Sequence, residues 1–250
     1  MASDKFPPFT FTNVFHNTVY PAIDPTNPKL SAKDKVILVT GGGRGLGKAI
    51  ASSFAIAGAR AIVLLGRTAS TLASSAADIS ARHKNVTVRT FPVDITDGSA
   101  VTSAVTAVRK EIGPIDVFIS NAGDFHYGSI AESNLAEYWK SIEINMLGTL
   151  NCVQAFLNHG IASDVFSGGQ APTFINLSTV GSHLPPYPGM SAYSISKLAT
   201  LKMMQCLQVE QGNKLRVFSI HPGTVATDMA RKAGVPSADE PGTYFDADDT

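Results

Sequence analysis

A tyrosine and a lysine stand four residues apart in the segment GMSAYSISKLA, Gly189 to Ala199. If this segment is helical, Tyr193 and Lys197 share one face, because residues i and i+4 lie one above the other. A free phenol has a pKa near ~10 and exchanges its proton poorly at neutral pH, whereas a positive charge beside it favours the tyrosinate. The spacing therefore predicts a tyrosine that serves as a general acid or base.

A glycine-rich turn, TGGGRGLG, follows the apolar run KVILVT and opens a helical pattern. Glycines at such a place let the backbone approach a pyrophosphate, and the unpaired N–H groups of the helix face the anion. The spacing of Gly41, Gly45 and Gly47 is T-G-x-x-x-G-x-G rather than the commoner G-x-G-x-x-G. The turn predicts a dinucleotide site, and a purely structural glycine turn is the alternative.

The same letters also match the start of a nucleoside-triphosphate loop. Gly42 to Lys48 read G-x-x-x-x-G-K, but the next residue is Ala49. Such a loop needs Ser or Thr at that position to ligate Mg²⁺. The triphosphate-hydrolase hypothesis therefore lacks its metal ligand.

Two arginines bear on the choice of dinucleotide. NAD sites usually carry Asp or Glu at the end of the second strand, about 20 residues on, to bind the ribose hydroxyls. Here Gly66 stands in that place and Arg67 follows it, while Arg44 lies in the glycine turn. Because guanidinium groups bind phosphate in a bidentate fork, the pair favours the 2′-phosphate of NADP(H) over NAD(H).

Apolar runs alternate with helical patterns along most of the chain. The expected strands are residues 35–40, 61–66, 86–93, 115–120, 173–178 and 215–220. The expected helices are residues 69–83, 98–112, 135–158 and the Tyr193 segment as far as about Gln211. Strands that are apolar on both faces and alternate with helices form a parallel sheet covered on both sides. Right-handed crossovers make it a doubly wound α/β fold of the Rossmann type, with one domain over residues 33–250 and an extended, proline-rich arm over residues 1–32.

The composition excludes several classes of protein. Of the 250 residues, 44% are hydrophobic and 16% charged, and the 20 basic and 20 acidic side chains cancel. A chain without net charge has no global field that would recruit nucleic acid or an anionic membrane. The sequence has neither an apolar run near ~20 residues nor a signal peptide, and its cysteines and histidines show no disulfide or metal-ligand spacing. We expect a soluble, cytoplasmic protein with no metal, no nucleic-acid partner and no membrane partner.

An ordered series of motifs over residues 35–230 resembles the short-chain dehydrogenase/reductase family. The motifs are Thr40 to Gly47, Asp94 in PVDITD, Asn121-Ala122-Gly123, Asn145 in IEINMLG, Ser178 in NLSTVG, Tyr193-x-x-x-Lys197, and Pro222-Gly223 with Thr227 in HPGTVATDM. The resemblance implies hydride transfer between a nicotinamide cofactor and a small-molecule carbonyl compound or secondary alcohol. It also implies a homodimer or homotetramer built through the two long helices.

The family pattern assigns four catalytic residues. Tyr193 would protonate the carbonyl oxygen, Ser178 would hydrogen-bond the developing oxyanion, and Lys197 would hold the nicotinamide ribose. Asn145 would hold a proton-relay water near the lysine. HLPPYPG looks like a small insertion between Ser178 and Tyr193, which leaves Ser182 as an alternative to Ser178.

The pattern also assigns the cofactor contacts, with Asp94 at the adenine and Thr227 at the nicotinamide amide or a phosphate. In isolation, either residue would more often be a helix cap. The implied cofactor-binding residues are Gly41, Arg44, Gly45, Leu46, Gly47, Arg67, Asp94, Ile95, Asn121, Ala122, Gly123, Tyr193, Lys197, Pro222, Gly223, Val225 and Thr227. The expected walls of the substrate pocket are Phe125, His126, His183, Tyr187 and Met190.

One departure from the family concerns the C-terminus. The sequence ends at Thr250, whereas family members continue through a further helix and a seventh strand. We therefore expect a sheet of at least six strands without that seventh strand. The departure also keeps open a second hypothesis, in which the chain is a non-catalytic NADP(H)-binding sensor or scaffold.

Overall fold

The computed structural model describes residues 16, 18–162, 171–183, 186–223, 225–232 and 245–246. Half of the predicted N-terminal arm, residues 1–15 and 17, lies outside these residues. The described part of the arm consists of turns and a short 3-10 helix, η1 (Pro28–Leu30). It meets the domain at Ala32, whose buried backbone N–H donates to the carbonyl of Ala57 over 2.8 Å.

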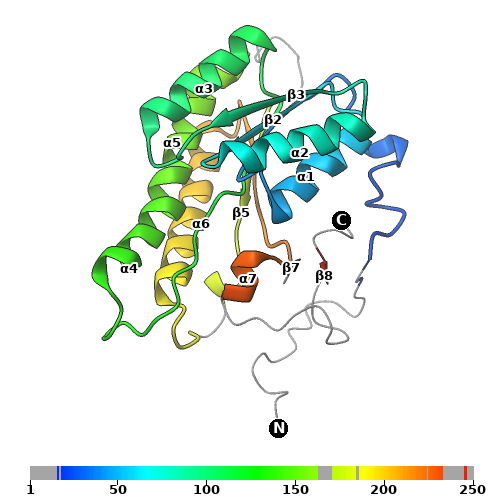
Figure 1. The fold of residues 1–250 in the computed structure, drawn as a ribbon. Helices are drawn as coiled ribbons and strands as arrows, with labels where there is room; N and C mark the ends of the chain where they lie inside the picture. Colours follow the sequence, from blue (N-terminus) through cyan, green and yellow to red (C-terminus); the bar gives the residue numbers. More distant parts are fainter. Residues whose placement is uncertain are drawn as a thin grey trace.

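A six-stranded parallel sheet forms the centre of the molecule (Figure 1). The order of the strands is β3-β2-β1-β4-β5-β6. Successive strands are added on one side of β1 as far as β3, and β4 then begins the series on the other side of β1. This confirms the predicted doubly wound fold. The strands are β1 (Val36–Thr40), β2 (Ala61–Gly66), β3 (Thr87–Pro92), β4 (Val117–Ser120), β5 (Thr173–Leu177) and β6 (Arg216–Ile220).

Helices cover both faces of the sheet (Figure 1). On one face lie α1 (Gly45–Ile56) and α2 (Ala69–Arg82). On the other face lie α3 (Gly98–Glu111), α5 (Gly148–Ala155) and α6 (Ser191–Gln211), with α4 (Leu135–Ile142) against α6. The residues of β1 and β2 are almost all fully buried, as strands covered on both faces must be.

The helix predicted over residues 135–158 is present, but two π-helical turns divide it. These turns are η2 (Glu143–Leu147), between α4 and α5, and η3 (Phe156–Gly160), after α5. A π turn inserts one extra residue into the helix and often occurs at a functional site. Asn145 lies in η2, where its carbonyl accepts the hydroxyl hydrogen of Thr149 over 2.7 Å.

The larger of the two apolar cores lies between the sheet and the helices α3, α5 and α6. At its centre three fully buried rings meet, those of Phe118, Phe156 and Phe174. The ring centroids of Phe118 and Phe174 are 5.1 Å apart, and those of Phe118 and Phe156 are 5.4 Å apart. These contacts join β4, β5 and η3 in one packed unit.

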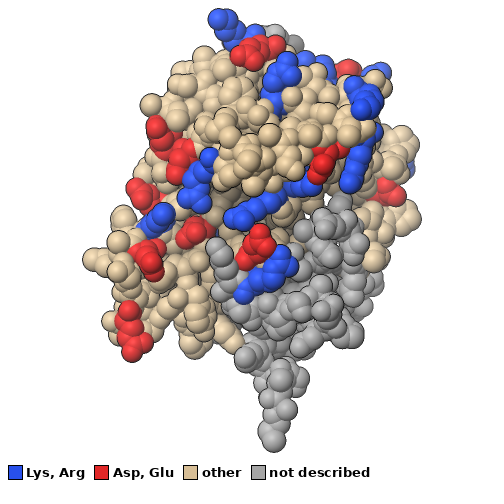
Figure 2. All heavy atoms as spheres, viewed as in Figure 1, with Lys and Arg blue, Asp and Glu red and all other residues tan. Residues whose placement is uncertain are grey.

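Beyond β6 the chain forms small elements outside the main sheet. They are β7 (Val225–Ala226), which pairs in parallel with β8 (Phe245–Asp246), and the short helix α7 (Asp228–Lys232). In the main sheet of the described residues, β6 is an edge strand. No described helix is both long enough and apolar enough to cross a lipid bilayer. Acidic and basic groups are interspersed on the face seen in Figure 2.

Replacing Phe118 by Ala should lower the free energy of unfolding by about 3–5 kcal/mol, because the fully buried ring leaves a cavity between two other rings. Urea denaturation followed by circular dichroism would measure the loss. Val209→Ala is the control, since Val209 is 87% exposed and its truncation should change stability by less than about 0.5 kcal/mol. Equal losses in the two variants would contradict this account of the core.

Candidate functional site

The turn after β1 has the backbone geometry that only glycine adopts readily. Gly41 and Gly45 have φ angles of +68° and +52°. A Cβ at Gly41 would lie 2.9 Å from the side-chain nitrogen of Asn121, and one at Gly47 would clash with the carbonyl oxygen of Gly41. The turn thus packs closely against the loop after β4, directly before the N-terminus of α1. This arrangement fits the pyrophosphate of a dinucleotide.

The loop after β4 is fastened to this turn by Thr40. The buried Thr40 hydroxyl accepts the backbone N–H groups of Asn121 and Ala122 over 3.0 and 2.9 Å. In return, the Asn121 side chain donates to the Thr40 carbonyl over 2.9 Å. The predicted Asn-Ala-Gly motif therefore serves first to hold two parallel strands in register where the sheet order reverses.

Asn145 links the same loop to α6. Its side-chain oxygen accepts the N–H of Asp124 over 2.8 Å, and its side-chain nitrogen donates to the Asp124 carbonyl and the Ser196 hydroxyl, both over 2.9 Å. Asn145 is 1% exposed. Both donors of the amide are engaged, so the side chain positions the loop. The predicted binding of a relay water stays a prediction.

The structure brings Tyr193 and Lys197 together in the first two turns of α6. The Lys197 ammonium lies 5.8 Å from the centroid of the Tyr193 ring and donates to the carbonyl of Leu177 over 2.7 Å. Gly123 completes the contact with the loop after β4, since a Cβ there would lie 3.7 Å from the lysine nitrogen. The loop after β4 therefore lies between the glycine turn and the Tyr193–Lys197 pair and contacts both.

Burial dominates the acidity of both groups. It raises the pKa of Tyr193 to about 12, and a hydrogen bond with Thr179 opposes that rise. Burial also lowers the pKa of Lys197 to about 8. The expected lowering of the tyrosine pKa by Lys197 is not observed, because the largest effect on the phenol is its removal from water, which raises the pKa. At neutral pH, Tyr193 is a neutral phenol able to donate a proton.

Thr179 is a site residue that the sequence analysis missed. Its hydroxyl oxygen accepts the N–H of Gly181 over 3.2 Å, which leaves its own hydrogen to donate to the Tyr193 oxygen. The neighbouring Ser178 extends the strand ladder, donating its N–H to Ile220 over 2.8 Å. Consecutive side chains of an extended chain point to opposite sides, so Ser178 and Thr179 cannot both face the phenol.

The segment NLSTVG contains two adjacent hydroxyl residues, Ser178 and Thr179, and this pair could have indicated Thr179 as a candidate. The sequence alone does not say which of the two hydroxyl groups faces the tyrosine. Ser182, the predicted alternative to Ser178, lies farther on, at the end of η4 (Val180–Ser182). Thr179 is the N-terminal cap of this short helix. Its hydroxyl is therefore held in a fixed direction beside the phenol.

Asp94 and Ile95 follow β3 at the same edge of the sheet. Burial acts to raise the pKa of Asp94, but hydrogen bonds from Thr96 and the charge of Arg67 hold it below its ordinary value. The Asp94 oxygen accepts from the N–H and hydroxyl of Thr96 over 3.0 and 2.8 Å. The side chain of Ile95 is buried against Gly148, so any contact with a cofactor would come from its backbone.

The loop after β6 lies against the glycine turn. Gly223 has a φ angle of +84°, and Val225 is buried. The methyl group of Thr227 would lie 3.4 Å from a Cβ at Gly45. Residues that are predicted to bind the cofactor after β1 and after β6 therefore lie side by side. Leu46, in contrast, packs partly buried against the core beneath α1.

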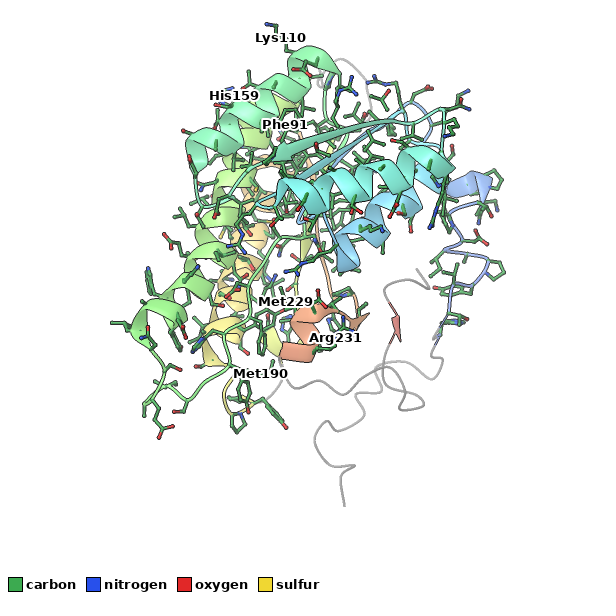
Figure 3. The ribbon with its side chains drawn as sticks, viewed as in Figure 1. Phe91, Lys110, His159, Met190, Met229 and Arg231 are labelled. Carbon is green, nitrogen blue, oxygen red and sulfur yellow. The ribbon has the colours of Figure 1, made fainter. Side chains whose placement is uncertain are left out.

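Aromatic rings stand beside Tyr193. The centroid of the Phe125 ring is 4.9 Å from that of Tyr193 and 6.5 Å from that of Tyr127. His126, another predicted wall residue, hydrogen-bonds the Ser133 hydroxyl over 3.0 Å. Met190 directly precedes α6, at the same end of the molecule as Met229 and Arg231 of α7 (Figure 3). Of the other predicted wall residues, Tyr187 is 38% exposed and His183 is the C-terminal cap of η4.

The triphosphate-loop hypothesis finds no support. Lys48 forms an ion pair with Asp78 of α2, and Ala49 is buried in the core. Within the described ranges, no group of three His, Cys, Asp or Glu side chains lies close enough together to hold a metal ion.

Sequence comparison places residues 35–236 in the short chain dehydrogenase family. The short chain dehydrogenase pigC of Monascus ruber is 36% identical over 226 residues, which cover 88% of this chain and 72% of that protein.

Solved structures agree with that match. A carveol dehydrogenase from Mycobacterium avium, in complex with NAD, superposes with a TM-score of 0.75 at 25% identity, covering 86% of this chain and 87% of that one. A short chain dehydrogenase from Burkholderia cenocepacia, in complex with NADP, superposes with a TM-score of 0.74 at 27% identity and covers 87% of both chains.

Replacing Asn145 by Ala should destabilise the fold by about 2–4 kcal/mol, because the N–H of Asp124 loses its partner and the Asp124 carbonyl keeps only the Ser141 hydroxyl. Asn145→Asp should cost a similar amount, since a carboxylate oxygen would then face the Asp124 carbonyl. Guanidinium denaturation would measure both. The exposed cap variant Asn134→Ala is the control, with a loss of about 1 kcal/mol from the N-terminus of α4. A loss for Asn145→Ala no larger than this would contradict the positioning role.

Proposed function

This chain belongs to the short-chain dehydrogenase/reductase family, and on that premise we propose that it is an NADP(H)-dependent carbonyl reductase or alcohol dehydrogenase. The single observation that carries the proposal is the neutral phenol of Tyr193, which is hydrogen-bonded to the Thr179 hydroxyl and lies near the Lys197 ammonium group. These groups stand one loop away from a glycine turn that fits a dinucleotide.

The relatives support a nicotinamide cofactor, since solved neighbours are in complex with NAD or NADP. We propose a preference for NADP(H) over NAD(H). It is supported by the absence of a carboxylate at Gly66 and by the guanidinium groups of Arg44 and Arg67. When bound, the cofactor supplies or accepts the hydride.

The remaining steps belong to the side chains of α6 and of the segment after β5. In carbonyl reduction, the Tyr193 hydroxyl donates its proton to the substrate oxygen as charge develops there. The Thr179 O–H then donates to the phenolate oxygen, and the Lys197 charge stabilises the same anion. Ser178 stays the competing candidate for the hydroxyl role.

The substrate we propose is a small carbonyl compound or secondary alcohol with an apolar body. Phe125 and Tyr127, both on the loop after β4, offer ring surface beside the reacting phenol. Their two rings are nearly parallel, with an angle of 14° between their planes. This geometry supports a flat, unsaturated or aromatic group next to the carbonyl.

We also propose that the protein forms a homodimer or homotetramer in the cytoplasm. Large apolar side chains stand exposed on α4 and α6, among them Leu135, Trp139, Ile195 and Leu198. An exposed apolar surface of this kind marks an interaction site. Cys152 and Cys206 are free thiols, as expected in a reducing compartment.

Tyr193→Phe should reduce turnover of a ketone panel with NADPH by about 10²–10⁴-fold, because the proton donor is removed. Binding of NADPH, followed by quenching of protein fluorescence, should change by less than about twofold. If the unaltered protein binds NADPH but turns over no carbonyl compound or alcohol, the sensor hypothesis replaces the enzymatic one.

Thr179→Ala should lower kcat by about 10–100-fold, and Thr179→Ser should restore most of it, since serine keeps the hydroxyl. Ser178→Ala is the matched neighbour and should retain most of the activity. The opposite ranking of the two alanine variants would return the hydroxyl role to Ser178.

The rate of carbonyl reduction should fall as pH rises through about 8, because Lys197 loses its proton there while Tyr193 keeps its proton up to about 12. Below pH 7 both groups are protonated and the rate should be flat. Steady-state kcat from pH 6 to 10, at saturating NADPH, would measure this. In Lys197→Met the rate should be low and independent of pH over the same range, whereas a persisting decline would assign the titration to another group.

A further inference from the structure

An ion pair joins the glycine turn after β1 to the short helix α7. The guanidinium of Arg44, in the glycine turn, lies 3.2 Å from a carboxylate oxygen of Asp228, the first residue of α7. The other oxygen of this carboxylate lies 2.6 Å from the guanidinium of Arg231. Acidic and basic groups are in contact over α7 in Figure 2, and Figure 3 shows Arg231 on this helix.

A second contact also holds the start of α7 against the glycine turn. Thr227, the neighbour of Asp228, lies against Gly45, the neighbour of Arg44. Segments 184 residues apart in the chain thus meet through two consecutive residue pairs. α7 is held to the turn by side chains that are largely in solvent, since the side chains of Arg44 and Asp228 are 70% and 52% exposed.

Two anions can therefore bind the guanidinium group of Arg44. Under the proposed function it binds the 2′-phosphate of NADP(H), but in the structure it already binds a carboxylate. Both anions take the same fork of N–H donors, so they compete for it. Arg231 keeps a charge beside Asp228 after Arg44 has turned away, which makes the exchange feasible.

We propose that Asp228 is a specificity-determining residue that weakens NADPH binding, and leaves NADH binding unchanged, by competing with the 2′-phosphate for Arg44. The proposal rests on the proposed function, because it needs Arg44 to contact that phosphate. The expected effect is modest. Exposed ion pairs contribute little to stability, and release of one should change affinity by about two- to fivefold.

The test is a double-variant cycle on cofactor affinity, measured as Kd for NADPH and for NADH by fluorescence titration without substrate. Asp228→Asn keeps the shape of the side chain and removes its charge. It should tighten NADPH binding by about two- to fivefold and leave NADH binding unchanged. Arg44→Gln should weaken NADPH alone, and Asp228→Asn should have no further effect on that background.

Glu111→Gln is the matched control for net charge. Glu111 is an exposed carboxylate at the end of α3, and removal of its charge should leave both affinities unchanged. If Arg44→Gln weakens NADPH but Asp228→Asn changes neither affinity, or changes both equally, the inference is overturned while the proposed cofactor preference stands. If Arg44→Gln leaves the preference for NADPH over NADH unchanged, the 2′-phosphate role of Arg44 fails, and the inference fails with it.

Discussion

The site depends on the hydrogen bonds that the buried Thr40 makes at the end of β1. Adjacent strands at the reversal point send their chains to opposite faces of the sheet, and a crevice opens between them. Thr40 and Asn121 fasten the two loops that border this crevice. Asn145 connects the loop after β4 to α6, because it hydrogen-bonds both Asp124 in the loop and Ser196, the residue before Lys197. Hydrogen bonds thereby connect the glycine turn to the helix that carries Tyr193 and Lys197.

Burial gives the acid–base pair its chemical character. Enclosed groups resist charging, so the phenol of Tyr193 stays neutral and the amine of Lys197 gives up its proton more easily than in water. A hydroxyl that donates to the phenolate works against the first effect. Thr179 is placed for this by its bond with Gly181, which uses the oxygen and leaves the hydrogen available. The ligand-free arrangement suits a proton donor better than a proton acceptor.

The polar contacts around the site are of two kinds, which differ in their exposure to solvent: buried contacts that are costly to break, and exposed contacts that can exchange partners. Those of Thr40 and Asn145 are enclosed, and losing one partner leaves a polar group without water, which is costly. The pair of Arg44 and Asp228 is exposed, so either group can change partner at little cost. Enclosed contacts thus hold the loops at the carboxyl ends of the strands, and an exposed ion pair joins the glycine turn to α7.

The sequence by itself determined the fold class, the glycine turn and the Tyr193–Lys197 pair, because each rests on periodicity or spacing within a few residues. It could also name Arg44 and Asn145, but not their partners. Only the tertiary structure decided that Thr179 contacts the phenol, that a π turn carries Asn145, and that Asp228 pairs with Arg44. The acidity of Tyr193 likewise depends on burial among segments distant in the chain. Such contacts and burial arise from packing, and no local pattern encodes them.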